Sequence, residues 1–78
     1  MIMVQRIQID PAVCHGKPTI RGTRVLVSTL LGALAAGDTV EALLEDYPNI
    51  RREDIQAALE FGSELSRYEE HEYEVATS

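Results

Sequence analysis

The chain changes from a strand-like to a helix-like pattern at the stretch Thr19-Ile20-Arg21-Gly22-Thr23-Arg24-Val25. Ile20 and Val25 favour strands, and Gly22 between them can adopt the positive φ that a tight turn needs. We therefore predict a small hairpin whose turn is flanked by two arginines. The residues before this stretch alternate like a strand, whereas those after it repeat like helices. The predicted fold is mainly α, with a short N-terminal β element followed by a three-helix bundle.

Upstream of the hairpin, residues 4–9 show the alternation of a β-strand. Ile7 and Ile9 fall on one face of this predicted strand. The strand is expected to end before Pro11, because proline fixes φ and donates no ladder hydrogen bond. We expect residues 12–18 to form a loop.

The first predicted helix follows the hairpin directly. Ser28 can cap its start, and the helix runs through Ala36 until Gly37 ends it. Its apolar residues recur at i, i+3, i+4 and i+7, which predicts one buried stripe. This stripe consists of Val27, Leu30, Leu31 and Leu34.

Two further helices are predicted in the second half of the chain. Asp38 and Glu41 resemble a capping box for the second helix, which ends before Pro48. The third helix is expected to start near Arg51 and Arg52. Its predicted buried stripe consists of Ile55, Ala58, Leu59, Gly62 and Leu65.

The length of 78 residues allows one domain. We assign residues 1–68 to a single helical domain, with the third helix fraying after Tyr68. Residues 69–78 are rich in glutamate and are expected to form a mobile acidic tail. A domain of this size buries a limited share of its surface and would gain stability from a partner.

Charge is distributed unevenly along the chain. Residues 1–37 carry four basic residues and one acidic residue, a net charge of +3, whereas residues 38–78 carry three basic and twelve acidic residues, a net charge of −9. Nonspecific affinity for nucleic acid comes from lysine and arginine, so the net charge of −6 disfavours binding along phosphates. The asymmetry points instead to a protein partner.

No stretch of the sequence has the length and hydropathy of a membrane span. The first six residues lack the features of a secretory signal. Cys14 is the one cysteine and cannot form an internal disulfide. We therefore expect a cytoplasmic protein.

The sequence gives no indication of an enzyme. Cys14 and His15 are neighbours, but we interpret them as a small buried cysteine and a loop histidine, since no orienting group follows them. Together with His71 they do not form a zinc-ligand pattern. We expect no catalytic residue, no metal and no cofactor.

The second and third helices, joined by residues 47–50, have the spacing of a helix-turn-helix motif. Gln56 would be placed to read adenine, and Arg51 and Arg52 would be placed to hold phosphate. Acidic residues on the same outward face argue against this, and the two arginines are equally well explained as surface charges. These acids are Glu53, Glu60 and Glu64.

The basic segment 17–24 is a better candidate for a binding site. Lys17, Arg21 and Arg24 surround the predicted turn, and arginine forks match phosphate or carboxylate groups. The structural alternative is that one or both arginines pair with helix acids and fix the hairpin on the helical core.

A second apolar stripe follows the third helix. Ala57, Phe61 and Tyr68 lie away from the Ile55/Leu59 stripe at 100° per residue. Phe61 and Tyr68 would then form a surface for a partner or for self-association. Alternatively, the N-terminal β element covers them.

The chain resembles the domain-of-unknown-function family 433 over about residues 5–65. The resemblance rests on a ten-residue block, His15-Gly16-Lys17-Pro18-Thr19-Ile20-Arg21-Gly22-Thr23-Arg24, and on four shorter matches. The shorter matches are Ile9-Asp10-Pro11, Leu34-Ala35-Ala36-Gly37, Tyr47-Pro48-Asn49, and Asp54-Ile55 with Ala57-Ala58-Leu59.

This resemblance implies a homeodomain-like three-helix fold and an antitoxin paired with a PIN-like ribonuclease toxin. It supplies no catalytic residues. We therefore expect a non-enzymatic antitoxin that neutralises such a toxin and possesses operator-binding activity as a second role, acting as a homodimer or higher oligomer. The alternative is a helix-turn-helix transcriptional regulator without a toxin partner.

Overall fold

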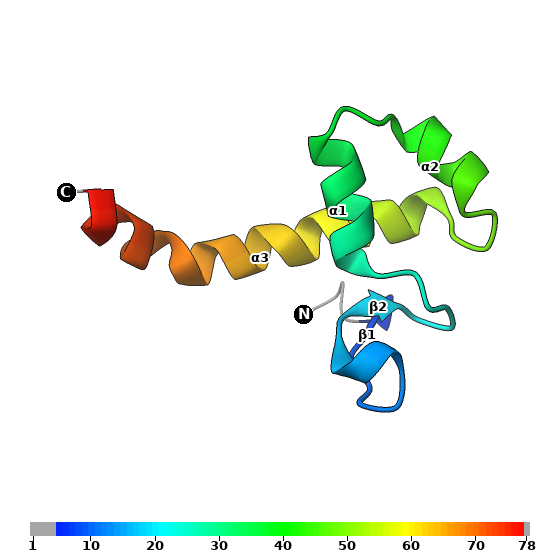
Figure 1. The fold of residues 1–78 in the computed structure, drawn as a ribbon, viewed down its shortest axis with the longest axis horizontal. Coiled ribbons are helices and arrows are strands. Elements are labelled where there is room, and N and C mark those ends of the chain that lie inside the picture. Colours follow the sequence, from blue (N-terminus) through cyan, green and yellow to red (C-terminus); the bar gives the residue numbers. More distant parts are fainter. Residues whose placement is uncertain (1–4, 78) are drawn as a thin grey trace.

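The structure is a computed structural model that describes the backbone of residues 5–77 and the side chains of residues 5–67. The described backbone holds three helices and a two-stranded antiparallel sheet, which confirms the predicted mainly α class (Figure 1). The elements in chain order are β1 (Ile7–Gln8), the 3-10 turn η2 (Cys14–Gly16), β2 (Thr19–Ile20), α1 (Val27–Ala35), α2 (Val40–Asp46) and α3 (Arg52–Thr77).

The sheet joins the predicted first strand to the start of the predicted hairpin. Ile7 pairs with Ile20 and Gln8 pairs with Thr19 in antiparallel register. The hairpin is also present, because the Ile20 N–H donates to the Val25 carbonyl at 2.9 Å after a turn at Gly22, whose φ is +81°. The N-terminal β element is therefore a narrow sheet that continues directly into α1.

The predicted capping of α1 by Ser28 is wrong. The helix starts at Val27, two residues earlier than a cap at Ser28 implies, and the extended residue Leu26 precedes it without a side-chain cap. The reason is a β-bridge between Thr19 and Leu26, which holds the chain extended up to the first helical turn. The predicted end is confirmed, since Gly37 has a φ of +106° and the Asp38 N–H donates to the Ala33 carbonyl, as in a Schellman motif.

The cap of α2 lies one residue later than predicted. Thr39, and not Asp38, accepts a hydrogen bond from the Ala42 N–H through its side chain, at 3.1 Å. Asp38 is unsuited to this role because its backbone still belongs to the end of α1. At the start of α3, Asp54 caps the helix in the other direction: its Oδ2 accepts from the Arg51 N–H at 2.8 Å.

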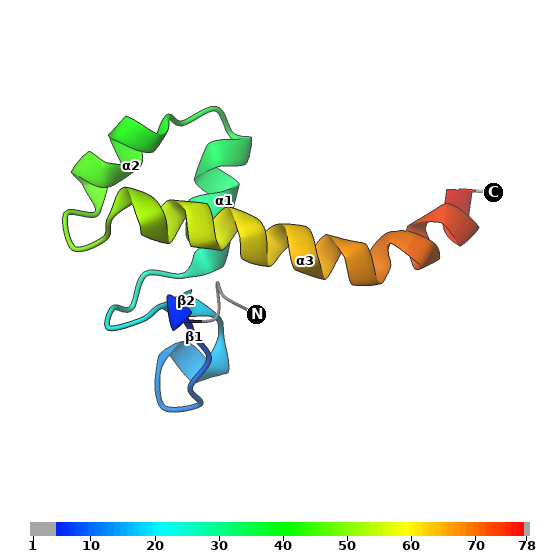
Figure 2. The ribbon, with the colours of Figure 1, turned by 180° about the vertical axis from the view of Figure 1, so that it is seen from behind.

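The core lies where α1, α2 and the sheet pack on the first half of α3 (Figure 2). Its buried apolar residues are Ile7, Ile20, Val27, Leu30, Leu43, Ile50, Ile55, Ala57 and Ala58. Both views show the second half of α3 projecting away from this body (Figures 1 and 2). No described helix has the length and apolar character needed to cross a membrane.

The predicted end of the third helix at Tyr68 is wrong, because α3 continues to Thr77. Glutamate and alanine, which favour helices, make up five of the nine residues 69–77, and no proline or glycine interrupts the segment. We predicted a mobile acidic tail over residues 69–78. The side chains of these residues lie outside the described part of the chain, so this stays a prediction.

Candidate partner-binding surfaces

Arg6 and Asp54 fix the β element on the helical core. Arg6 Nη1 lies 2.9 Å from Asp54 Oδ1, and the second carboxylate oxygen of Asp54 caps α3 through the Arg51 N–H. The Asp54 side chain is 11% exposed, so a charged partner and a backbone donor together satisfy it. The predicted alternative gave this role to Arg21 or Arg24, whereas the ion pair that joins the β element to a helix acid is made by Arg6, which the sequence analysis did not single out. The sequence signal was the acidic residue three positions after the α3 cap.

Arg21 lies on the surface but holds the first strand in place. Its Nε donates to the Gln5 carbonyl at 2.6 Å, and its Nη2 donates to the Ile7 carbonyl at 3.2 Å. A guanidinium offers several donors in one plane, which suits it to bind two carbonyls that lie two residues apart on the same edge of the chain. The predicted role of Arg21 in binding a partner therefore competes with a role inside the β element.

Lys17 and Arg24 are exposed on the same β element. Arg24, Asn49 and Gln8 contribute to an open, shallow pocket of about 550 Å³ that lies beside the turn. Asn49 belongs to the connection between α2 and α3, so the structure brings the hairpin arginine next to that connection. Two of the three basic residues of the segment, Lys17 and Arg24, therefore place positive charge at the surface.

Cys14 is half-buried rather than buried, which corrects the prediction for this residue. Its thiol donates a long contact of 3.7 Å to the Arg24 carbonyl, and His15 beside it is exposed. Both residues have positive φ in η2, within the segment predicted to be a loop. Among the described residues, no group of three histidine, cysteine, aspartate or glutamate side chains is placed to hold a metal ion.

The predicted nucleic-acid face of α3 is partly neutralised. Arg52 Nη2 lies 3.1 Å from Glu41 Oε2, and both side chains are exposed. The pKa of Glu41 is lowered, first by a hydrogen bond from its own backbone N–H and then by Arg52. Arg51 and Gln56 are exposed as predicted, but the exposed acid Glu53 stands between them in the sequence.

The buried stripe of α3 differs from the predicted one at two leucines. Leu59 and Leu65 are 43% and 51% exposed, whereas Ala57, predicted to face outward, is buried. At 100° per residue, Leu59 points away from the direction of Ala58, which is the most buried residue of the helix. Leu65 lies on the same face as Ala58 but beyond the elements that pack on α3, so it is exposed. The periodicity of the sequence predicts which side of α3 is apolar, but it does not show how far along α3 the other elements pack.

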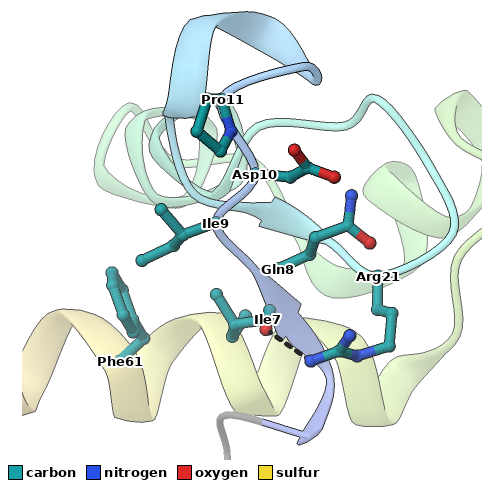
Figure 3. Close-up of a pocket in the computed structure, with 7 residues that line it drawn as sticks. All are labelled: Ile7, Gln8, Ile9, Asp10, Pro11, Arg21 and Phe61. Carbon is teal, nitrogen blue, oxygen red and sulfur yellow. Dashed lines mark hydrogen bonds between the residues drawn. The ribbon is translucent and has the colours of Figure 1, made fainter.

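Phe61 is half-buried against the core and lines a groove with the first strand. The groove has a volume of about 460 Å³ and is bounded by Ile7, Gln8, Ile9, Asp10, Pro11, Arg21 and Phe61 (Figure 3). Ile9 is 61% exposed, so the β element covers Phe61 only in part. Phe61 is therefore partly covered, as one alternative predicted, and its role in a partner surface stays a prediction. The side chain of Tyr68 lies outside the described residues.

We call Ile9, Phe61 and Leu65 the apolar face. Phe61 and Leu65 are one helical turn apart on α3, and Ile9 reaches toward Phe61 from the strand (Figure 3). Glu60 and Glu64 lie beside these residues on the same helix, and Glu64 Oε2 is 3.7 Å from Arg67 Nη1. The protein is a small helical module with an exposed basic segment and a partly exposed apolar face.

Residues 7–62 match the family model described as "Protein of unknown function (DUF433)". The chain belongs to this family, as the resemblance predicted. It is 42% identical over 49 residues to the uncharacterized protein y4eO of Sinorhizobium fredii (strain NBRC 101917 / NGR234). This match covers 63% of the chain and 22% of y4eO, so the chain spans about a fifth of the length of this relative.

Two solved structures are similar in fold. The crystal structure of a DUF433 member from Anabaena variabilis ATCC 29413 has a TM-score of 0.75 and 36% sequence identity, and the match covers 91% of this chain and 71% of that one. The crystal structure of Rv2018 from Mycobacterium tuberculosis has a TM-score of 0.60 and 34% identity, and the match covers 68% of this chain and 24% of that one.

Proposed function

We propose that the chain is a non-enzymatic antitoxin that acts in the cytoplasm by binding and neutralising a PIN-like ribonuclease toxin. The single observation that carries this proposal is the apolar face, which stays exposed on a chain of net charge −6. The family resemblance supplies the class of partner. The apolar face supplies a surface with which a protein partner can be held.

The energetics favour a protein as the ligand of this surface. Ile9 and Leu65 are each more than half exposed, and burying the remaining area of such a side chain contributes about 1 kcal/mol. Phe61 between them adds an aromatic surface of the kind that is enriched at interfaces. The acids beside the face, Glu60 and Glu64, favour a partner with basic residues at the rim.

The basic side of the molecule supports a second contact with the same toxin. PIN-like nucleases hold metal ions through clustered carboxylates, and Lys17 and Arg24 present exposed positive charge. Arg24 is the better placed of the two hairpin arginines, because Arg21 donates to strand carbonyls.

Co-expression tests the proposal. The chain is expressed with the product of the neighbouring gene, and growth and complex formation are measured by rescue and pull-down. Rescue by the wild-type chain that is lost with Leu65→Asp, and retained with the exposed but distant control Glu45→Ala, is the expected result. Absence of both rescue and a complex with the wild-type chain contradicts the proposal.

A second candidate function is DNA binding through the α2–α3 connection, with a homodimer supplying two half-sites. It is favoured by the position of Arg24 beside Asn49 and by the exposed Arg51. It is disfavoured by the Arg52–Glu41 ion pair. A gel shift with the DNA upstream of the gene tests it: if Arg24 or Arg51 contacts phosphate, its replacement by alanine weakens the complex and makes its affinity less dependent on salt.

A further inference from the structure

We propose that the outer edge of β1 is a strand-addition site for an extended segment of the partner protein, carrying an apolar side chain and a carboxylate. This inference rests on the proposed function, because it names the part of the partner that the chain recognises. The site consists of the backbone of residues 7–9, Arg21 and Phe61.

One edge of β1 is paired and the other is not. The Arg6 carbonyl accepts from the Arg21 N–H at 2.8 Å, so this carbonyl faces β2. Because backbone groups alternate in direction along a strand, the carbonyls of Gln5 and Ile7 face the other edge. No strand among the described residues pairs with that edge. Unpaired strand edges are templates for the addition of another strand.

The side chain of Arg21 occupies the place that the backbone of an added strand would take. It donates to the Gln5 and Ile7 carbonyls, the groups that the N–H donors of a new strand would need. The bond to Ile7 is the longer of the two, at 3.2 Å. Among residues 5–67, none accepts a hydrogen bond from the Ile9 N–H. Within the described residues, the edge thus offers one unpaired donor, the Ile9 N–H, and one acceptor, the Ile7 carbonyl, whose hydrogen bond is long.

The groove beside this edge gives the added segment its side-chain pocket. Ile9 and Phe61 lie on one side of the strand, and Gln8 and Arg21 lie on the other (Figure 3). The volume of about 460 Å³ and the exposure of Ile9 leave room for an apolar side chain between Ile9 and Phe61. Because side chains of a strand alternate between its faces, an apolar residue here places its neighbour on the Arg21 side.

Charge decides the chemistry of the segment. When a new strand takes the Ile7 carbonyl, the guanidinium of Arg21 loses an acceptor, and a carboxylate on the incoming strand replaces it. Arg21 supplies the positive charge at this edge, whereas Asp10 lines the other end of the groove, so we expect the carboxylate of the incoming segment beside Arg21. Arg21 also disfavours a second copy of the chain, since pairing two β1 edges would bring two guanidinium groups together.

The experiment uses the full chain as bait for a phage library of short random peptides. We expect enrichment of peptides in which an apolar residue lies next to an aspartate or glutamate. Ile9→Pro, which removes the free N–H, should weaken a selected synthetic peptide about tenfold, and Ile9→Val should not. NMR of the complex should show inter-strand contacts between the peptide and residues 7–9.

A double-mutant cycle then tests the role of Arg21. Replacing the acid of the peptide by its amide should weaken binding to the wild-type chain several-fold, but not to Arg21→Gln. Circular dichroism confirms that each variant is folded, and Ile9→Pro provides the test if Arg21→Gln is not.

Three results would overturn the inference: no enriched peptides, binding that is equal in Ile9→Pro and wild type, or a dimer of the chain that occupies the β1 edge in solution. Its failure can be told from failure of the proposed function. If Ile9→Pro still rescues cells from the toxin, the strand-addition site is refuted and the antitoxin role is not. If peptides bind at β1 but the chain does not rescue cells, the antitoxin role is refuted and the strand-addition site is not.

Discussion

Arg6 and Asp54 lie 48 positions apart in the sequence, yet Arg6 Nη1 and Asp54 Oδ1 are 2.9 Å apart. The same carboxylate caps α3 through the Arg51 N–H. One aspartate therefore connects the β element, the start of α3 and the turn before it. The surfaces that we assign to partners depend on this connection, because it holds the strand edge against the helix.

Asp54→Ala should destabilise the fold by about 2–3 kcal/mol, since it removes a charged hydrogen bond and the α3 cap together. Urea denaturation followed by circular dichroism measures this. The matched control is Glu53→Ala, which removes an exposed acid from the same helical turn and should cost less than about 0.5 kcal/mol. Equal effects of the two variants would refute the bridging role of Asp54.

Arg21→Lys keeps the positive charge but removes the planar fork that binds two carbonyls. We expect a loss of about 1 kcal/mol in stability and faster hydrogen exchange of the Arg21 N–H, which donates to the Arg6 carbonyl. Arg24→Lys is the control, and it should leave both quantities unchanged. Identical behaviour of the two variants would show that Arg21 does not hold the strand.

Two glycines should respond oppositely to alanine. Gly22 has a φ of +81°, so Gly22→Ala should cost about 1 kcal/mol through backbone strain. Gly32 lies inside α1 with open space around its Cα, and Gly32→Ala should stabilise the protein by up to about 1 kcal/mol. Thermal unfolding of both variants checks the signs, and a stabilising Gly22→Ala would contradict the observed turn.

The pKa of Glu41 should lie below its ordinary value of 4.5, because its own backbone N–H and Arg52 both favour the ionised carboxylate. A group with a lowered folded-state pKa contributes stability above its unfolded pKa, and this contribution is lost as the pH falls through the folded-state value. NMR titration should place the change below pH 4.5, and Arg52→Gln should raise the pKa only part of the way. A pKa unmoved by Arg52→Gln would show that the surface ion pair does not form in solution.

The sequence was sufficient for the element order but not for the surfaces. Gly37 and Pro48 act locally, so the ends of the first two helices were predicted close to their observed bounds, whereas the third helix runs to Thr77 and not to Tyr68. The exposure of Leu65 depends on where α1 and the sheet stop along α3, and local periodicity carries no information about that. The pairing of Arg6 with Asp54 joins distant positions, and the sequence offered several equivalent acids.

The hairpin illustrates the same division. The turn at Gly22 follows from local chemistry and was predicted, as was the exposure of Lys17 and Arg24. The use of Arg21 to bind the carbonyls of Gln5 and Ile7 was not predicted, because it depends on the strand that pairs with β2.

The central claim, that this chain works by holding a protein partner on its apolar face, is tested most directly by the affinity of the purified chain for a PIN-like nuclease from the same genome. Isothermal titration calorimetry with wild type, Leu65→Asp and the control Glu45→Ala gives that affinity. We predict tight binding by wild type and Glu45→Ala, and at least about a tenfold loss with Leu65→Asp. Equal affinities for all three, or no binding by the wild-type chain, would contradict it.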